Sequence, residues 1–160
     1  MSRRKNQIIE NLEISDIAAE GVAVGRSENY VIFVKGVIPG DVVNVVLTRK
    51  RKSYSEAKVL EIVKPSPDRI EPVCKHFTKC GGCKWLMLPY EKQLYYKQKQ
   101  VSDQISRLGG VKDVPVNEII GATNTEFYRN KLEYTFSDRR WLDSGDAEIE
   151  RVDRNTEGLG

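Results

Sequence analysis

The chain has 160 residues, 39% hydrophobic and 31% charged, a composition typical of a globular rather than a disordered protein. No apolar run reaches the roughly 20 residues of a membrane-spanning helix, and the basic N-terminus MSRRKNQ leads into no signal-like apolar stretch. The net charge of +3 is unevenly distributed: residues 1–112 carry 20 Lys/Arg against 12 Asp/Glu, whereas residues 113–160 carry 6 against 11. The basic first part is therefore expected to bind a polyanion such as nucleic acid. A basic surface that is simply solvated is the alternative.

The first 63 residues predict a small β-barrel. Runs rich in Val and Ile alternate with turn signals such as IPGD (38–41) and RKRKS (49–53). Five strands in so short a segment favour a closed barrel, because closure removes exposed strand edges. A five-stranded barrel of the oligonucleotide-binding type is the leading candidate. The expected strands are residues 7–14, 21–24, 30–34, 41–48 and 57–63.

A linker and a cysteine-rich segment follow the barrel, over residues 64–88. The proline-rich run KPSPDRIEP (64–72) disfavours both helix and strand pairing and marks the end of the barrel.

Residues 89–160 predict one helix and then the start of a central domain of mixed helices and strands. Pro89 is well placed as the first helical residue, and Gly109-Gly110 as the end. Residues 116–120 and 127–136 are expected to be strands, which makes the fold mixed and mainly β. One apolar stripe, expected to pack into a core, comprises Leu94, Val101, Ile105 and Leu108.

All three cysteines lie in CKHFTKCGGCKW (74–85), at Cys74, Cys80 and Cys83. The C-x5-C-x2-C pattern suits one metal centre, and thiolates select zinc, copper(I) or iron–sulfur clusters. A structural zinc ion and a cubane cluster each take four ligands, so the chain is one ligand short. His76, the only histidine, lies just two residues from Cys74, a spacing that makes it difficult for both side chains to bind the same metal centre. Three thiols without metal are the remaining alternative, although the lysines around them argue against an apolar core segment.

The order of several motifs resembles the N-terminal part of the RNA (uracil-5-)-methyltransferases. The motifs are GVAVGR (21–26), VKGVIPGDVV (34–43), PSPDRIEPVC (65–74), CGGCKW (80–85) and YRNKLEYTF (128–136). The resemblance implies that the barrel is a TRAM domain that binds RNA, and that the cysteines hold a [4Fe–4S] cluster with a fourth ligand further along the chain. YRNK would lie in a central domain that clasps RNA. The S-adenosylmethionine domain, with the cysteine that attacks uracil C6, would come last.

The sequence departs from that family pattern where the catalytic domain would begin. It has no glycine-rich cofactor loop, no fourth cysteine and no further thiol to serve as nucleophile. We therefore expect no catalytic residue and no S-adenosylmethionine-binding residue in this chain. It is interpreted as an inactive N-terminal fragment of a longer enzyme, in which the cluster is incomplete or absent.

Basic residues near aromatic ones are the candidate RNA contacts, because Lys and Arg neutralise phosphates and a ring can stack on an unpaired base. Most lie at a predicted hairpin tip of the barrel, where a solvated turn is the alternative. Two come from the YRNK motif, where pairing with Glu126 or Glu133 is the alternative. The candidates are Arg49, Lys50, Arg51, Lys52, Tyr54, Lys58, Arg129 and Lys131.

The leading interpretation is the RNA-binding part of an S-adenosylmethionine-dependent RNA (uracil-5-)-methyltransferase acting on 23S ribosomal RNA or transfer RNA. The alternative is a self-standing RNA-binding protein with a structural zinc site. An electron carrier is disfavoured by the basic surface and by the spacing, since two-cluster ferredoxins use C-x2-C-x2-C. We expect a cytoplasmic monomer whose partner is RNA, with no DNA or membrane partner.

Overall fold

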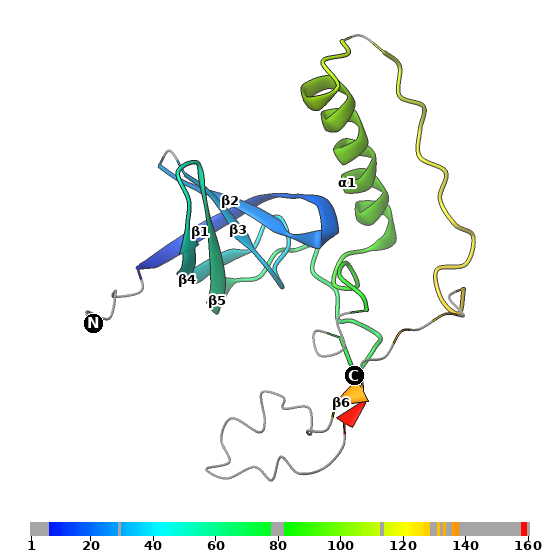
Figure 1. Ribbon diagram of the computed structural model, residues 1–160. Helices are drawn as coiled ribbons and strands as arrows, with labels where there is room; N and C mark the ends of the chain where they lie inside the picture. Colours follow the sequence, from blue (N-terminus) through cyan, green and yellow to red (C-terminus); the bar gives the residue numbers. More distant parts are fainter. Residues whose placement is uncertain are drawn as a thin grey trace.

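The computed structural model describes residues 7–28, 30–77, 82–112, 114–128, 131, 133, 136–137 and 158–159. A β-barrel stands beside one long helix, and an extended segment runs back along that helix (Figure 1). Within the described residues, none of the helices combines the length and the apolar character that crossing a bilayer requires. The barrel strands are β1 Ile8–Ile17, β2 Ala23–Ser27, β3 Tyr30–Val34, β4 Val42–Lys50 and β5 Tyr54–Lys64.

The five strands close into a barrel, as the sequence predicts, and their order around it is β1-β2-β3-β5-β4. Neighbouring strands are antiparallel except β3 and β5, which pair in parallel from Val31 opposite Tyr54 to Val34 opposite Ala57. β5 starts three residues earlier than predicted, because the amide of Arg51 donates to the carbonyl of Tyr54 (2.8 Å) and tightens the turn. The pairing of β4 with β5 therefore continues up to Lys50 and Ser55, directly beside the basic turn.

The barrel interior is filled by alternate residues of the strands, as the two-residue period of a strand requires. Val43 and Val45 of β4 are fully buried, whereas the intervening Asn44 is half-buried and donates to Glu61 on β5 (3.3 Å). The core cluster comprises Leu12, Ile14, Ala23, Ile32, Val34, Val37, Val43 and Val45.

A second apolar cluster lies where the barrel meets the rest of the chain. It comprises the buried residues Ile17, Ile38, Met87 and Leu88, with Phe77, Trp85 and Tyr96 packed against them. The first two come from the barrel and its loop, whereas Met87 and Leu88 precede the helix. This cluster fixes the cysteine-bearing segment and the helix against one end of the barrel.

The long helix α1, Tyr90–Asp103, continues as a π-helical turn, Gln104–Leu108. Pro89 proves to be the cap rather than the first helical residue, and Gly110 ends the element with φ of +64°. The prediction that the apolar stripe packs into a core is wrong for the described structure, since neither element contains a buried residue and Leu108 is 84% exposed. The helix instead contacts the barrel through Tyr96.

The two strands predicted after the helix are not present as predicted. Residues 116–120 form no strand, and among the described residues of 127–136 only Phe136 is in one, β6 Phe136–Ser137, which pairs with β7 Gly158–Leu159. A strand needs a neighbour to satisfy its backbone groups. Ile120 and Phe127 are 96% and 102% exposed, so the described segment that carries them has no such neighbour.

A buried carboxylate, that of Asp41, joins the barrel to the linker. Its Oδ2 accepts from the amide of Ile38 (2.8 Å), and its Oδ1 accepts from the amide of Ser66 (2.8 Å). The guanidinium of Arg69 completes the shell, with Nε 3.2 Å from Oδ1 and Nη2 on Oδ2. The backbone carbonyl of Asp41 also accepts from Ile14 on β1 (2.9 Å). One side chain thus ties the 38–41 turn to the linker that leads to the cysteines.

Asp41→Ala should lower the free energy of unfolding by about 3–5 kcal/mol, because it leaves the guanidinium and two amides without their acceptor. Chemical denaturation of the intact protein measures this loss. The matched control is Asp68→Ala, which removes an exposed ion pair with Lys92 (2.8 Å) and should cost less than about 1 kcal/mol. Equal losses for the two variants would contradict the joining role of Asp41.

Candidate nucleic-acid interface and cysteine segment

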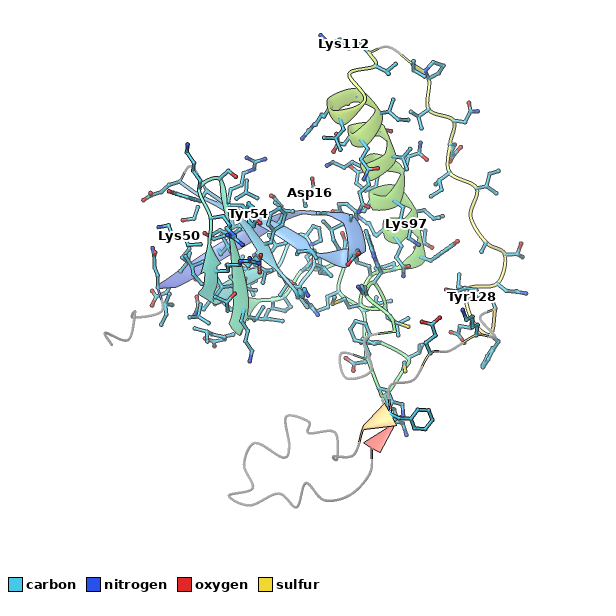
Figure 2. All side chains as sticks on the ribbon, viewed as in Figure 1. Asp16, Lys50, Tyr54, Lys97, Lys112 and Tyr128 are labelled. Atoms are coloured by element: carbon cyan, nitrogen blue, oxygen red, sulfur yellow. The ribbon has the colours of Figure 1, made fainter. Side chains whose placement is uncertain are left out.

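The β4–β5 turn presents a run of cations at the end of the barrel away from α1 (Figure 2). Arg49, Lys50, Arg51 and Lys52 are all exposed. Arg49 forms a loose ion pair with Glu56 on the paired strand, with Nη1 3.6 Å from Oε1. Such an exposed pair contributes little stability and is readily exchanged for a phosphate. The sequence prediction of a basic hairpin tip is therefore matched by the placement of these four residues.

Aromatic rings flank these cations. The Nζ of Lys50 lies 5.1 Å from the centroid of the Tyr30 ring, within cation–π distance. Tyr54 contacts Phe33 edge to face, with centroids 5.5 Å apart, and is half-buried. Lys58, further along β5, is exposed. Sequence reasoning missed Tyr30, and its signal was its position at the first residue of the strand after a turn.

The described cysteines are free thiols. Cys74 is half-buried and Cys83 is exposed, whereas Cys80 lies outside the described residues. Among the residues that the structure describes, no three metal-ligating side chains converge, and His76 is exposed. The donor set still suits a soft metal or an iron–sulfur cluster, because thiolates are the ligands these prefer.

The segment after Cys83 rests on the corner between β1 and β2. Gly21, with φ of +72°, lies so close that an added Cβ would stand 3.0 Å from the carbonyl oxygen of Lys84 and 3.2 Å from Nε1 of Trp85. The Nζ of Lys84 reaches Glu20 (3.4 Å), and the amide of Ile70 donates to the carbonyl of Met87 (3.1 Å). The position of Cys83 is therefore set by the barrel.

Charged contacts hold α1 on the barrel. Lys99 donates to Asp16 of β1 and to Asp103 one turn along the helix (3.2 Å). The hydrogen bond to Asp16 raises the pKa of Lys99 above its ordinary 10.5, and the bond to Asp103 adds to it against the opposing effect of burial. Burial, followed by the charge of Asp16, raises the pKa of Tyr96. Lys99 is thus a charged structural contact.

The linker is also held to the start of α1. Lys92 pairs with Asp68 (2.8 Å), and this hydrogen bond raises the pKa of Lys92. Both side chains are well exposed, so the pair orients the linker rather than stabilising it strongly.

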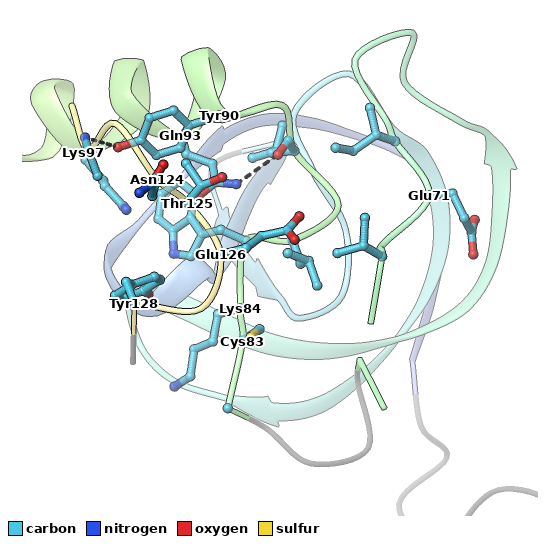
Figure 3. Close-up of a pocket in the computed structure, with 17 residues that line it drawn as sticks. Glu71, Cys83, Lys84, Tyr90, Gln93, Lys97, Asn124, Thr125, Glu126 and Tyr128 are labelled. Carbon is cyan, nitrogen blue, oxygen red and sulfur yellow. Dashed lines mark hydrogen bonds between the residues drawn. The ribbon is translucent and has the colours of Figure 1, made fainter. Parts of the chain in front are cut away.

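A cleft of about 690 Å³ lies between the cysteine segment, the first turns of α1 and residues 122–128 (Figure 3). Cys83 and Lys84 line one wall, and Tyr90, Gln93 and Lys97 of α1 line another. The third wall includes Asn124, Thr125, Glu126 and Tyr128. Sequence reasoning did not anticipate this cleft, because residues from Ile70 to Tyr128, up to 58 positions apart in the chain, form it.

The two candidates from the YRNK motif are placed differently. Arg129 lies outside the described residues. Lys131 is exposed, and its Nζ is 3.0 Å from Oε1 of Glu133, the pairing weighed as its alternative. Both partners are about four-fifths exposed, so this pair leaves Lys131 accessible to a phosphate.

Comparison with known proteins gives a domain match and a set of relatives. Residues 5–60 match the TRAM domain family. The chain is 49% identical over 126 residues to an uncharacterized RNA methyltransferase of Bacteroides thetaiotaomicron, covering 79% of this chain and 28% of that protein. A Porphyromonas gingivalis relative of the same name is 47% identical over 131 residues, covering 82% and 28%. One of Chlorobaculum tepidum is 40% identical over 141 residues, covering 87% and 29%.

The chain therefore spans a little under a third of the length of these relatives. The resemblance to RNA methyltransferases and the barrel's assignment as a TRAM domain are confirmed. The matched residues 5–60 contain nearly all of the barrel, including the basic turn.

Gly21→Ala should weaken the seating of the cysteine segment on the barrel. The matched control is Gly36→Ala, since Gly36 has φ of +81° but no neighbour within 4 Å of an added Cβ. Both variants carry the backbone penalty of about 1–2 kcal/mol for a left-handed residue. Only Gly21→Ala should lower the free energy of unfolding by more than this backbone penalty, as measured by chemical denaturation. It should also shift the fluorescence of Trp85. Identical losses with unchanged Trp85 emission would contradict the close contact.

Proposed function

We propose that the protein is the RNA-binding part of an S-adenosylmethionine-dependent RNA (uracil-5-)-methyltransferase that acts on ribosomal or transfer RNA. One observation carries the proposal: a TRAM barrel that presents four successive cations beside Tyr30, in a chain 49% identical to a protein named as an RNA methyltransferase. The relatives' name supports the general class, and the sequence motifs support the uracil-5 reaction.

The β4–β5 turn would bind RNA through phosphate and stacking contacts together. Arg49, Lys50, Arg51 and Lys52 are exposed on the turn between two paired strands of a closed barrel, so their charges are held near one another at little cost in backbone entropy. Tyr30, beneath Lys50, offers a ring on which an unpaired base can stack. Because duplex RNA hides its base edges and faces, this combination favours single-stranded loops.

In the proposed parent reaction, a cysteine thiolate outside residues 1–160 adds to uracil C6, which makes C5 nucleophilic. S-adenosylmethionine supplies the methyl group to C5. A base then removes the C5 proton, and elimination of the thiolate restores the ring. The role of this chain in that sequence is to bind and orient RNA. We expect residues 1–160 alone to transfer no methyl group.

Cys74, Cys80 and Cys83 would hold a [4Fe–4S] cluster, with a fourth ligand from outside this chain. The free thiols of Cys74 and Cys83 and the soft character of the donor set fit that group. The cluster would serve as a structural centre that fixes the segment between the linker and α1. Lys84 would keep positive charge beside it, next to the RNA.

Replacing Arg49, Lys50, Arg51 and Lys52 together by Ala should weaken binding to single-stranded RNA and flatten its salt dependence. Each lost phosphate contact lowers the slope of log affinity against log salt by about 0.7. Fluorescence anisotropy titrations at several salt concentrations measure both effects.

The control replaces Lys35, Lys64 and Lys112 by Ala, which removes three exposed cations elsewhere. Its salt slope should stay within about one unit of the unchanged protein, as expected where few phosphates are contacted. A quadruple variant with the original slope would remove the turn from the interface.

The parent protein prepared without oxygen should be brown and contain iron and sulfide in equal amounts, with little zinc, whereas residues 1–160 alone should hold an incomplete cluster or none. Cys83→Ser should lose both iron and sulfide, because the thiolates are the proposed ligands. Ser102→Ala, a half-buried substitution on α1, is the control and should retain them. One zinc ion per chain, with neither iron nor sulfide, would instead support the structural zinc site.

A further inference from the structure

The cleft beside Cys83 is a defined space rather than a loose gap between segments. Tyr90 fixes its third wall, because its hydroxyl accepts from the amide of Ala122 (2.6 Å). Gln98 fixes the same segment further up the helix by donating to the carbonyl of Asn117 (2.9 Å). The volume of the cleft, about 690 Å³, lies within the range of about 300–1,000 Å³ that is typical of small-ligand sites.

The polar groups of the cleft suit the edge of a nucleobase. Gln93 donates to the carbonyl of Leu88 (2.9 Å), which leaves its side-chain oxygen without a donor among the described residues. Asn124 and Thr125 add an exposed amide and an exposed hydroxyl from the opposite wall. Together these groups offer both donors and acceptors, as recognition of a base edge requires.

The charged residues of the cleft favour a phosphate on one side and a base on the other. Lys97 is exposed on α1 and has no ion pair within the described part of the chain, whereas Lys84 is engaged with Glu20. Glu126 lines the cleft as well and would repel a phosphate. A phosphate is therefore favoured on the Lys97 side, and the carboxylate of Glu126 can accept from N–H groups of a base.

An exposed ring completes the cleft. Tyr128 lines it with 75% of its surface exposed, on the same side of the molecule as Lys97 and away from the basic turn (Figures 2 and 3). A large exposed aromatic next to a cation is the combination that binds unpaired nucleotides.

We propose that this cleft binds one unpaired nucleotide of RNA, with its base stacked on Tyr128 and its phosphate on Lys97. The inference rests on the proposed RNA-binding function and adds a second contact point, distinct from the β4–β5 turn. Because Cys83 lines the same cleft, the bound nucleotide lies next to the cysteine segment. The RNA would thus extend from the barrel to the cysteines.

Tyr128→Leu in the intact protein should weaken binding to a single-stranded RNA oligonucleotide by about 5- to 150-fold, the range for loss of one base–aromatic stack. Tyr128→Phe keeps the ring and should bind normally. The matched control is Phe127→Leu, since Phe127 is a fully exposed neighbouring ring that does not line the cleft. Lys97→Ala should lower the salt slope by about 0.7, the value for one phosphate contact on a single strand, whereas Lys112→Ala should not.

Ultraviolet crosslinking of the intact protein to a thiouridine-containing RNA tests the same contact directly, and crosslinks at Tyr128 are expected. Normal affinity of Tyr128→Leu, together with weak binding by the quadruple turn variant, would overturn the cleft proposal and leave the proposed function standing. Absence of RNA binding by the unchanged protein would overturn both. Equal weakening by Phe127→Leu would also overturn it, because the effect would not belong to the cleft.

Discussion

The hydrogen-bonded shell of Asp41 is the interaction on which the placement of the other parts depends. A carboxylate without contact to water is stable only when its oxygens are fully paired, and here two amides and one guanidinium meet that need. Since these donors come from the 38–41 turn and from the linker, barrel and linker cannot shift independently. The second apolar cluster, with Ile38 and Met87, packs next to this joint. Arg69 bridges the two, because its Nη1 also lies 3.7 Å from the sulfur of Met87.

Because of this joint, the small barrel fixes the position of two features that lie outside it, the cysteine segment and the cleft beside Cys83. The β4–β5 turn lies at one end of the barrel, and the cysteine segment is seated at the β1–β2 corner against Gly21. The cleft beside Cys83 uses the same seat and the start of α1 as two of its walls. RNA that contacted both the turn and the cleft would therefore meet a surface whose parts are already placed. Binding to such a surface costs less ordering entropy than binding to segments that fold on contact.

The sequence predicted the barrel well and the later part poorly, for physical reasons. In the barrel, alternation of buried Val43 and Val45 with polar neighbours is a local signal that strand pairing then satisfies. Residues 116–120 have a similar Val and Ile content but no partner strand among the described residues, so propensity alone did not form a strand. The stripe on α1 failed likewise, since a helical period predicts an apolar face but not what covers it. The basic turn was predicted from charge, whereas Tyr30 and the cleft depend on contacts between distant residues that no local pattern encodes.

We expect RNA to bind along a prearranged surface from the β4–β5 turn to the cysteine segment. Hydrogen–deuterium exchange of the intact protein, with and without a single-stranded RNA oligonucleotide, tests it most directly. Bound RNA should slow exchange in residues 49–54, in residues 82–97 and in residues 122–128, with little change in strand β2. Protection confined to residues outside these three segments, or equal protection by duplex DNA, would contradict it.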